Sequence, residues 1–227
     1  MMRASHQFTE QQRQAINQAV AEAESKTAAE IVPVVAAASG RYERSEDIVG
    51  LWTGIILMFL IWAILPEPVR ATGTWDGITP GWKFFWMLVA LVGGFLVGTT
   101  AAGYRWQLRW WFTPAAQMAA EVTHRARLAF YDATVHQTGG GTGLLIYISL
   151  FERRAAVLGD DAILERLGQQ TLDDLCSELT AKLRSGDLTH ALCDTIADAG
   201  KALARALPRQ PDTQNELPDT LVLLDEV

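Results

Sequence analysis

The chain has 227 residues, of which 49% are hydrophobic and 20% are charged, and its formal net charge is −7. This length is enough for one or two domains with a sizeable core. The acidic balance argues against a nucleic-acid-binding protein, which needs basic patches to offset phosphate charge. Two cysteines, Cys176 and Cys193, are too few for a disulfide scaffold and suit a reducing compartment.

The segment before residue 47 predicts one helix and one strand. Thr9 followed by Gln12 has the pattern of a capping box and marks a helix start. Apolar residues then recur at helical spacing over residues 16–23. Residues 30–36 form a short apolar run rich in β-branched side chains, which predicts a buried strand. Pro33 within this run indicates a sheet edge or a missing ladder hydrogen bond.

Two long uncharged segments follow and predict a transmembrane hairpin over residues 47–103. Residues 48–65 and residues 84–103 contain no Asp, Glu, Lys or Arg. As helices, each would span roughly 27–30 Å, about the thickness of a hydrocarbon core. Tryptophans gather near both ends of the segments, as in an interfacial aromatic belt. The alternative, a pair of buried core helices, would carry polar residues on part of each circumference.

Small residues indicate how the two helices would pack. Gly50 and Gly54 are four residues apart, and so are Gly94 and Gly98. Gly54 and Gly98 are expected at similar depth, where small residues let backbones approach closely. The alternative is that glycine is simply common in membrane helices. Since neither segment carries an ionisable residue, the hairpin is expected to be an anchor and not an ion path.

Charged residues that flank the hairpin indicate its orientation. More of them are basic at the open end than at the loop, which favours a cytoplasmic open end. The N-terminal segment also lacks an apolar stretch that would carry it across a membrane. We therefore expect a protein of the cell membrane, the inner membrane of a bacterium, with two spans and a cytoplasmic soluble domain. The basic residues are Arg41, Arg44, Arg105 and Arg109 at the open end, and Arg70 and Lys83 near the loop.

The segment after the hairpin predicts a helix, two strands and three further helices, followed by a tail. The tail, residues 208–227, is acidic and interrupted by prolines, so we predict that it is disordered. The two strands are expected to form a hairpin. The predicted elements are a helix over 114–137, strands over 143–150 and 153–158, helices beginning after Asp160 and at Thr171, and a last helix over 188–207.

The two soluble segments are expected to form one domain. An isolated strand is not stable, so the strand over residues 30–36 needs the strands beyond Gly143 as partners. Two membrane spans return the chain to its starting side, which allows residues 1–46 and 104–207 to meet. The predicted fold class is α/β: a three-layer α/β/α sandwich with a small mixed sheet, interrupted by a two-helix transmembrane hairpin.

Several short stretches of the two soluble segments are similar to the strands of a known family: residues 29–35 and 39–42 to its first strand, and residues 142–150, 152–154 and 157–160 to its second and third. On these stretches the chain resembles the TPM domain family, over roughly residues 8–46 and 112–206. The resemblance implies an α/β sandwich with a small central sheet between helices. The family includes acid-phosphatase-like thylakoid proteins, photosystem repair factors and a receptor-modulating subunit, and many members carry a signal peptide. This chain differs in lacking that signal and in the inserted hairpin.

The first candidate site of chemistry is acidic. Asp160 and Asp161 follow the third predicted strand, and Glu30 lies at the start of the first. Because ligands of open α/β sheets favour the carboxyl ends of strands, Asp160 and Asp161 could hold a divalent cation, Ca²⁺ or Mg²⁺, or supply the acid of a phosphatase. The alternative is that they cap the next helix, which Asp does well.

The second candidate site is the charged turn Glu152-Arg153-Arg154 between the second and third predicted strands. Its side chains could engage a phosphate group or a protein partner, and the alternative is a solvated hairpin turn.

The sequence predicts a non-enzymatic, membrane-anchored α/β domain that binds a partner in the assembly or maintenance of a membrane-associated protein complex. The alternative is a metal-assisted phosphatase. The expected partners are membrane lipid and a membrane-associated protein, with a homo-oligomer left open and no nucleic acid.

Overall fold

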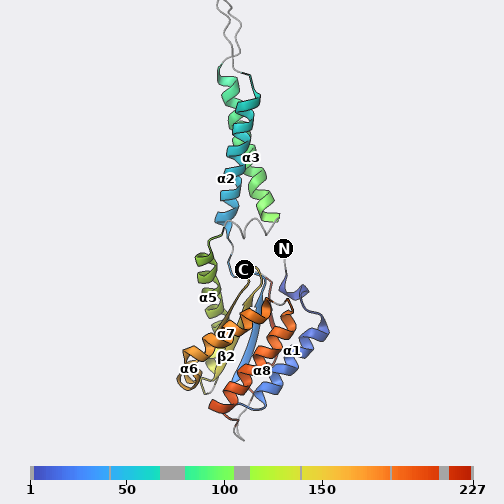
Figure 1. Ribbon diagram of the computed structural model, residues 1–227, viewed down its shortest axis with the longest axis vertical. Coiled ribbons are helices and arrows are strands. Elements are labelled where there is room, and N and C mark those ends of the chain that lie inside the picture. Colours follow the sequence, from blue (N-terminus) through green and yellow to red (C-terminus); the bar gives the residue numbers. More distant parts are fainter. Residues whose placement is uncertain are drawn as a thin grey trace, which may run out of the picture. The chain divides into compact units, whose positions relative to one another are not determined.

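A computed structural model of the chain describes residues 3–40, 42–66, 80–104, 113–138, 140–184, 186–209 and 215–225. The chain divides into two compact units. Residues 42–114 form the hairpin unit, and residues 2–41 together with 115–227 form the α/β unit. The α/β unit is therefore built from two stretches of chain, one before and one after the hairpin unit in the sequence (Figure 1).

The α/β unit contains a four-stranded mixed sheet in the order β3-β2-β1-β4. β1 and β2 are parallel, with Ile31 opposite Leu144, and β3 runs antiparallel to β2. The N-terminal strand thus lies beside the strand that follows the hairpin, as predicted. The strands are β1 (Glu30–Ala36), β2 (Gly143–Ser149), β3 (Arg154–Gly159) and β4 (Val222–Leu224).

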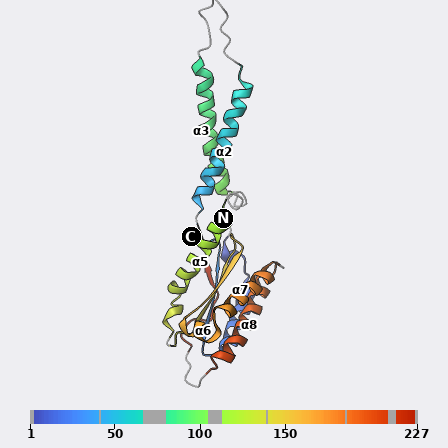
Figure 2. The ribbon, with the colours of Figure 1, turned by 60° about the vertical axis from the view of Figure 1, so that its left-hand side comes forward.

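Helices cover both faces of the sheet, which gives the predicted three layers (Figures 1 and 2). Alternate residues of β1 point to opposite faces. Ile31 and Val35 pack with α1, α6, α7 and α8, whereas Val32 and Val34 pack with α5. The helices are α1 (Glu10–Glu24), α5 (Ala115–Asp132), α6 (Asp161–Leu167), α7 (Gln169–Leu183) and α8 (Leu188–Ala206), with short 3-10 turns η1 (Ala4–His6) and η2 (Val135–Gln137).

Local hydrogen bonds explain several helix ends. The Gln12 backbone N–H donates to Thr9 Oγ1 at 3.3 Å, and the Thr9 N–H donates to Gln12 Oε1 at 2.8 Å. This capping box confirms the predicted start of α1. The helix expected over residues 114–137 ends earlier, at Asp132, because Thr134 adopts a left-handed conformation with φ 54° before η2.

The helix predicted to begin at Thr171 begins at Gln169 instead. Gly168, with φ 77°, separates α6 from α7 and takes the place of the expected cap. The Thr171 hydroxyl donates to the backbone oxygen of Leu167 at 2.7 Å, so this side chain bonds back to the preceding turn.

The prediction of a disordered tail is wrong for β4. β4 pairs in parallel with residues 34–36 of β1, and the Ala37 N–H donates to the Leu224 oxygen at 2.8 Å. Beyond β4, the Asp225 carboxylate accepts hydrogen bonds from the Ser5 N–H and hydroxyl at 2.9 and 2.6 Å. Composition does not predict β4, because this short strand is held by backbone hydrogen bonds to β1, which is distant in the sequence. Residues 210–214 and 226–227 lie outside the described part of the tail.

Pro33 fits within β1 because of where β4 begins. Successive residues of a strand direct their N–H groups to opposite neighbours. Glu30 donates to Thr142 on the β2 side, and Ala37 donates to Leu224 on the β4 side. The backbone nitrogen of Pro33 therefore points toward β4, which pairs only with residues 34–36. The absent N–H of proline leaves no gap in the ladder.

The hairpin unit consists of α2 (Glu43–Ile64) and α3 (Pro80–Tyr104). Apolar stretches of 19 and 24 residues make both helices long enough to cross a membrane. Their large apolar side chains are exposed in the chain by itself, including Phe59, Ile64, Phe84, Leu96 and Val97. The connecting residues 67–79, with Arg70, and the flanking residues Arg41, Arg105 and Arg109 lie outside the described residues.

The glycines lie where α2 and α3 approach each other. A Cβ atom added to Gly94 would be 2.7 Å from the Cα of Gly54, and one added to Gly98 would be 2.8 Å from the Cα of Gly50. The expected pairing of Gly54 with Gly98 at one depth is therefore wrong. The facing pairs in the structure, Gly54 with Gly94 and Gly50 with Gly98, are thus shifted by one helical turn from that expectation.

We predict that Gly94→Leu separates α2 from α3, whereas Gly93→Leu does not. Nothing lies within 4 Å of a Cβ atom added to Gly93, so this neighbour is a matched control of equal helix propensity. The expected cost at Gly94 is about 1–3 kcal/mol, as for overpacking elsewhere. Thermal unfolding of the full chain in detergent, followed by circular dichroism, measures the difference. Equal stability of the two variants would contradict close packing at Gly94.

Candidate functional site

The structure separates the two groups of charged residues that the sequence singles out. Glu152 lies in the turn between β2 and β3, and Asp160 follows the end of β3. Since β3 is antiparallel to β2, Ser149 is opposite Arg154 and Leu144 is opposite Gly159. The two groups thus lie at opposite ends of the sheet, separated by roughly 17 Å of strand. They do not form a common site.

Glu152 is the centre of a buried hydrogen-bond network at the carboxyl ends of β1 and β2. Its side chain is 4% exposed and accepts hydrogen bonds from the Ser39 N–H at 2.8 Å and the Gly40 N–H at 3.3 Å. The Ser149 hydroxyl donates to the other carboxylate oxygen. Ser39 Oγ lies 2.9 Å from both Ser149 Oγ and Tyr147 Oη. Burial raises the pKa of the Tyr147 hydroxyl.

The same turn contacts both stretches of the α/β unit that adjoin the hairpin in sequence. Glu152 holds the backbone of Ser39 and Gly40, where the first stretch ends, and the Arg154 guanidinium donates to the Ala115 oxygen at 3.4 Å, where the second begins. Arg153, between them, adopts a left-handed conformation with φ 53°. The charged turn therefore holds together the two stretches of the α/β unit near the point where the hairpin unit interrupts them in the sequence.

We predict that Glu152→Ala destabilises the α/β unit by about 3 kcal/mol, because it leaves three buried donors without an acceptor. Glu178→Ala, at an exposed position of α7, is the matched control and should change stability little. Denaturant unfolding of the full chain in detergent measures both. If the two variants unfold at the same denaturant concentration, the network does not support the fold.

Asp160 is the N-cap of α6. Its carboxylate accepts a hydrogen bond from the Asp161 N–H at 2.9 Å, which is the capping role considered as the alternative. Within the described ranges, no three His, Cys, Asp or Glu side chains are grouped so as to hold a metal ion. A divalent cation at Asp160 and Asp161 stays a prediction.

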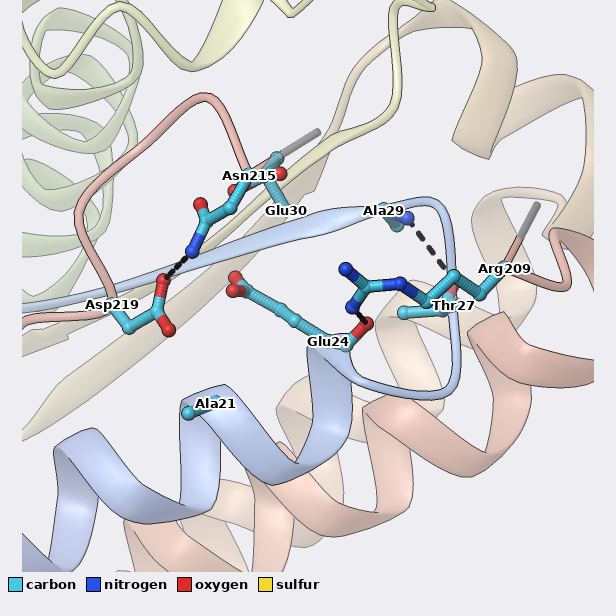
Figure 3. A pocket seen from close by; sticks show the side chains of 8 residues that line it. All are labelled: Ala21, Glu24, Thr27, Ala29, Glu30, Arg209, Asn215 and Asp219. Atoms are coloured by element: carbon cyan, nitrogen blue, oxygen red, sulfur yellow. Dashed lines mark hydrogen bonds between the residues drawn. The ribbon is translucent and has the colours of Figure 1, made fainter. Parts of the chain in front are cut away.

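A different group of acidic residues lines a small cavity at the amino end of β1 (Figure 3). Glu24 is the last residue of α1, Glu30 is the first of β1, and Asp219 comes from the tail before β4. We call this cavity, of about 60 Å³, the acidic pocket. It is lined by Ala21, Glu24, Thr27, Ala29, Glu30, Arg209, Asn215 and Asp219.

Each of the two glutamates uses one carboxylate oxygen to bind a backbone N–H. Glu24 Oε1 accepts from Ile31 at 2.6 Å, and Glu30 Oε1 accepts from Glu216 at 3.2 Å. The other oxygen, Oε2, of each glutamate is buried and has no hydrogen-bond partner. Figure 3 shows the Glu24 carboxylate pointing across the pocket toward Asp219, which itself accepts a hydrogen bond from Asn215 at 2.6 Å.

Burial dominates the electrostatics of the acidic pocket. The pKa of Glu24 is raised to about 8, mainly by burial and also by the nearby carboxyl groups of Glu30 and Asp219, against a lowering by the Ile31 N–H. Burial also raises the pKa of Glu30, while backbone N–H groups of the tail lower it. Glu24 is therefore mostly protonated at neutral pH.

We predict that Glu24→Gln removes a pH dependence of stability. The pKa of Glu24 is higher in the folded state than in the unfolded state, so the free energy of unfolding falls as the pH rises from about 4.5 to about 8 and stays low above that. The wild-type Tm should drop by about 5 °C or more between about pH 6 and about pH 9, and the variant should lose most of this drop.

Circular dichroism of the full chain in detergent measures both transitions. The charged and titratable groups that face Glu24 are Glu30, Asp219 and Arg209. An equal pH dependence in the variant would assign the effect to Glu30 or Asp219 instead.

Of the three acidic residues, only Glu30 was a candidate from the sequence, and Glu24 and Asp219 were not predicted. A signal for Glu24 exists, because Ile16, Val20 and Glu24 recur every four residues and all three are buried on one side of α1. A charged residue on an apolar stripe indicates a buried carboxylate. Asp219 carries no comparable signal, since only the path of the tail brings it to the pocket.

Comparisons with known proteins give a fold likeness. No protein-family model and no curated protein matches the sequence. A similar solved structure is the NMR structure of the BA42 protein from the psychrophilic bacterium Bizionia argentinensis. It has 18% sequence identity and a TM-score of 0.54, and the match covers 95% of this chain and 94% of BA42. At this identity the likeness shows a shared α/β fold.

Proposed function

We propose that the chain is a membrane-anchored α/β domain that binds a protein partner in the assembly or maintenance of a membrane-associated complex. The observation that carries the proposal is the apolar exterior of the hairpin unit. Phe59, Ile64 and Val97 are 59%, 73% and 61% exposed. An apolar surface of this kind is unfavourable in water and is covered by lipid in a membrane.

The aromatic residues of the hairpin unit support membrane insertion. Trp52, near the open end, and Trp62 and Trp86, toward the loop, are about half exposed, at 56%, 53% and 45%. Indoles at both ends of two spans suit the two interfaces of a bilayer. The Lys83 ammonium lies 5.7 Å from the centre of the Trp62 ring, which places a positive charge at the loop end. We propose that the α/β unit lies in the cytoplasm, because more basic residues flank the open end of the hairpin than its loop.

The use of the charged residues supports a binding role over hydrolysis. Glu152 serves the network that closes the α/β unit, and Asp160 serves as a helix cap. A metal-assisted phosphatase would need the Asp160 carboxylate for its chemistry. The fold implied by the TPM resemblance is the fold of the α/β unit, and BA42 shares it without defining an activity.

The anchor is tested on membranes from cells that express the full chain. We expect the protein to stay in the membrane fraction through an alkaline carbonate wash, because two lipid-covered helices are not released by loss of charge interactions. A reporter fused after Val227, compared with a cysteine label in the 66–81 loop, should place the two on opposite sides. Release of the protein by carbonate would contradict the anchor.

The partner is tested by cross-linking in cells, followed by affinity capture of the full chain in mild detergent. We expect one membrane-associated protein in defined stoichiometry with the chain. A soluble protein with no span, expressed with the same tag, is the control for adventitious capture. Recovery of the chain by itself as a monomer, or bound only to further copies of itself, would contradict a partner-binding role.

A further inference from the structure

We infer that the acidic pocket receives the ammonium group of a lysine side chain from the partner protein. The inference rests on the proposed function, because it names the chemistry by which the α/β unit recognises that partner. Glu24, Glu30 and Asp219 approach the pocket from α1, β1 and the tail. An ammonium has three hydrogen-bond donors and no acceptor, which suits three carboxylates that converge from different elements.

The first observation is that two buried carboxyl oxygens of the pocket have no hydrogen-bond partner. Glu24 and Glu30 are 7% and 5% exposed, and the Oε2 atom of each is buried with no hydrogen-bond partner. Folded proteins rarely leave buried polar atoms in this state, since each costs about 1–3 kcal/mol and more when charged. A ligand that brings N–H groups to both oxygens removes this cost.

The second observation is the charge balance of the lining. Three carboxyl groups face the pocket, and among the described residues that line it Arg209 alone is basic. The Arg209 guanidinium donates to the backbone oxygen of Glu24 at 3.0 Å, and the Glu24 Oε2 atom stays without a partner. Arg209 and Asn215 also line the pocket and are exposed, so the described lining extends to the protein surface.

The spacing of the carboxylates favours an ammonium over a bare metal ion. A metal needs its oxygen ligands at about 2.0–2.6 Å, and so close to one another, whereas an ammonium nitrogen hydrogen-bonds at about 2.7–3.0 Å and tolerates a wider spread. Throughout the described residues, no three acidic, histidine or cysteine side chains are grouped tightly enough for a metal. The cavity of about 60 Å³ exceeds the roughly 10–15 Å³ that a cavity needs to hold one water, so an ammonium fits.

Binding of an ammonium should release a proton from Glu24, so the affinity of the site should depend on pH. Burial holds Glu24 in its neutral form, and a cation in the pocket favours the ionised form. Affinity for lysine should therefore rise by about tenfold or more between about pH 6 and about pH 9, where lysine itself stays charged. Simple attraction to an exposed acidic surface has no such dependence.

The experiment is an NMR titration of the full chain in detergent micelles, with ¹³C-labelled glutamate. The probe is the peptide acetyl-Gly-Lys-Gly-amide, and the control peptide carries norleucine in place of lysine. We expect a saturable shift of the Glu24 and Glu30 carboxyl signals with the lysine peptide and no shift with the norleucine peptide. Ca²⁺ and Mg²⁺ are titrated separately as metal probes.

Variants locate the effect. Glu24→Gln and Glu30→Gln should each weaken binding of the lysine peptide by about tenfold or more, as expected when one charged hydrogen bond is lost. Both replacements keep an oxygen that can accept from the backbone N–H, so the fold is retained. Glu22→Gln, two residues away on α1 with a side chain that is 69% exposed, is the matched control and should bind like the wild type.

Two results would overturn the inference: no shift with the lysine peptide, or a shift of the same signals by Ca²⁺ or Mg²⁺ with none by the peptide. The first leaves the pocket without this ligand, and the second makes it a metal site. Either result is distinguishable from failure of the proposed function. A chain that stays in the membrane and captures its partner, yet ignores the lysine peptide, loses only this inference.

Discussion

The rest of the α/β unit depends on the parallel pairing of β1 with β2. The seven residues of β1 lie in continuous register with those of β2, from Glu30 opposite Gly143 to Ala36 opposite Ser149. In the chain, the whole hairpin unit and α5 lie between these strands. A parallel pair always needs a long connection, so an insertion at this point uses a crossover that the fold requires anyway. Because both strands are buried on both faces, neither stretch of chain can hold its strand without the other.

Interruption of a domain at a strand end creates a physical problem, because the ends of the two stretches must stay in place. Glu152 and Arg154 address it from a single turn, by binding the backbone of Ser39 and Gly40 on one side and of Ala115 on the other. A buried carboxylate is costly unless its hydrogen bonds are satisfied, and here backbone N–H groups and a serine hydroxyl satisfy them. The charge in this turn is therefore explained by the fold.

The acidic pocket has the opposite character. Two glutamates are buried with one oxygen of each unpaired, and the tail brings a third carboxyl group toward them. Natural proteins break the rule of satisfied polar groups mainly where function requires it. The same tail supplies β4, so the strand that completes the sheet and the wall of the pocket come from one segment. A change in the path of this segment would therefore affect both the sheet and the pocket.

Local patterns were enough for much of the architecture. The capping box of Thr9 and Gln12, the uncharged stretches of the hairpin, and the cap at Asp160 each depend on neighbouring residues, so they can be recognised without knowledge of distant contacts. The need of a lone strand for partners also predicted the pairing of β1 with β2. The boundaries were less accurate, since Gly168 and Thr134 set them through backbone conformations that composition does not display.

The sequence by itself determined the helices, the central strands and the apolar hairpin, because these follow from periodicity, length and capping. Tertiary structure decided four other features: the pairing of β4 with β1, the glycine register of α2 and α3, the separation of Glu152 from Asp160, and the meeting of Glu24, Glu30 and Asp219. Each of these depends on which residues, distant in the chain, come to lie side by side. That choice is made by backbone hydrogen bonding and packing over the whole unit, and no single stretch of sequence contains it.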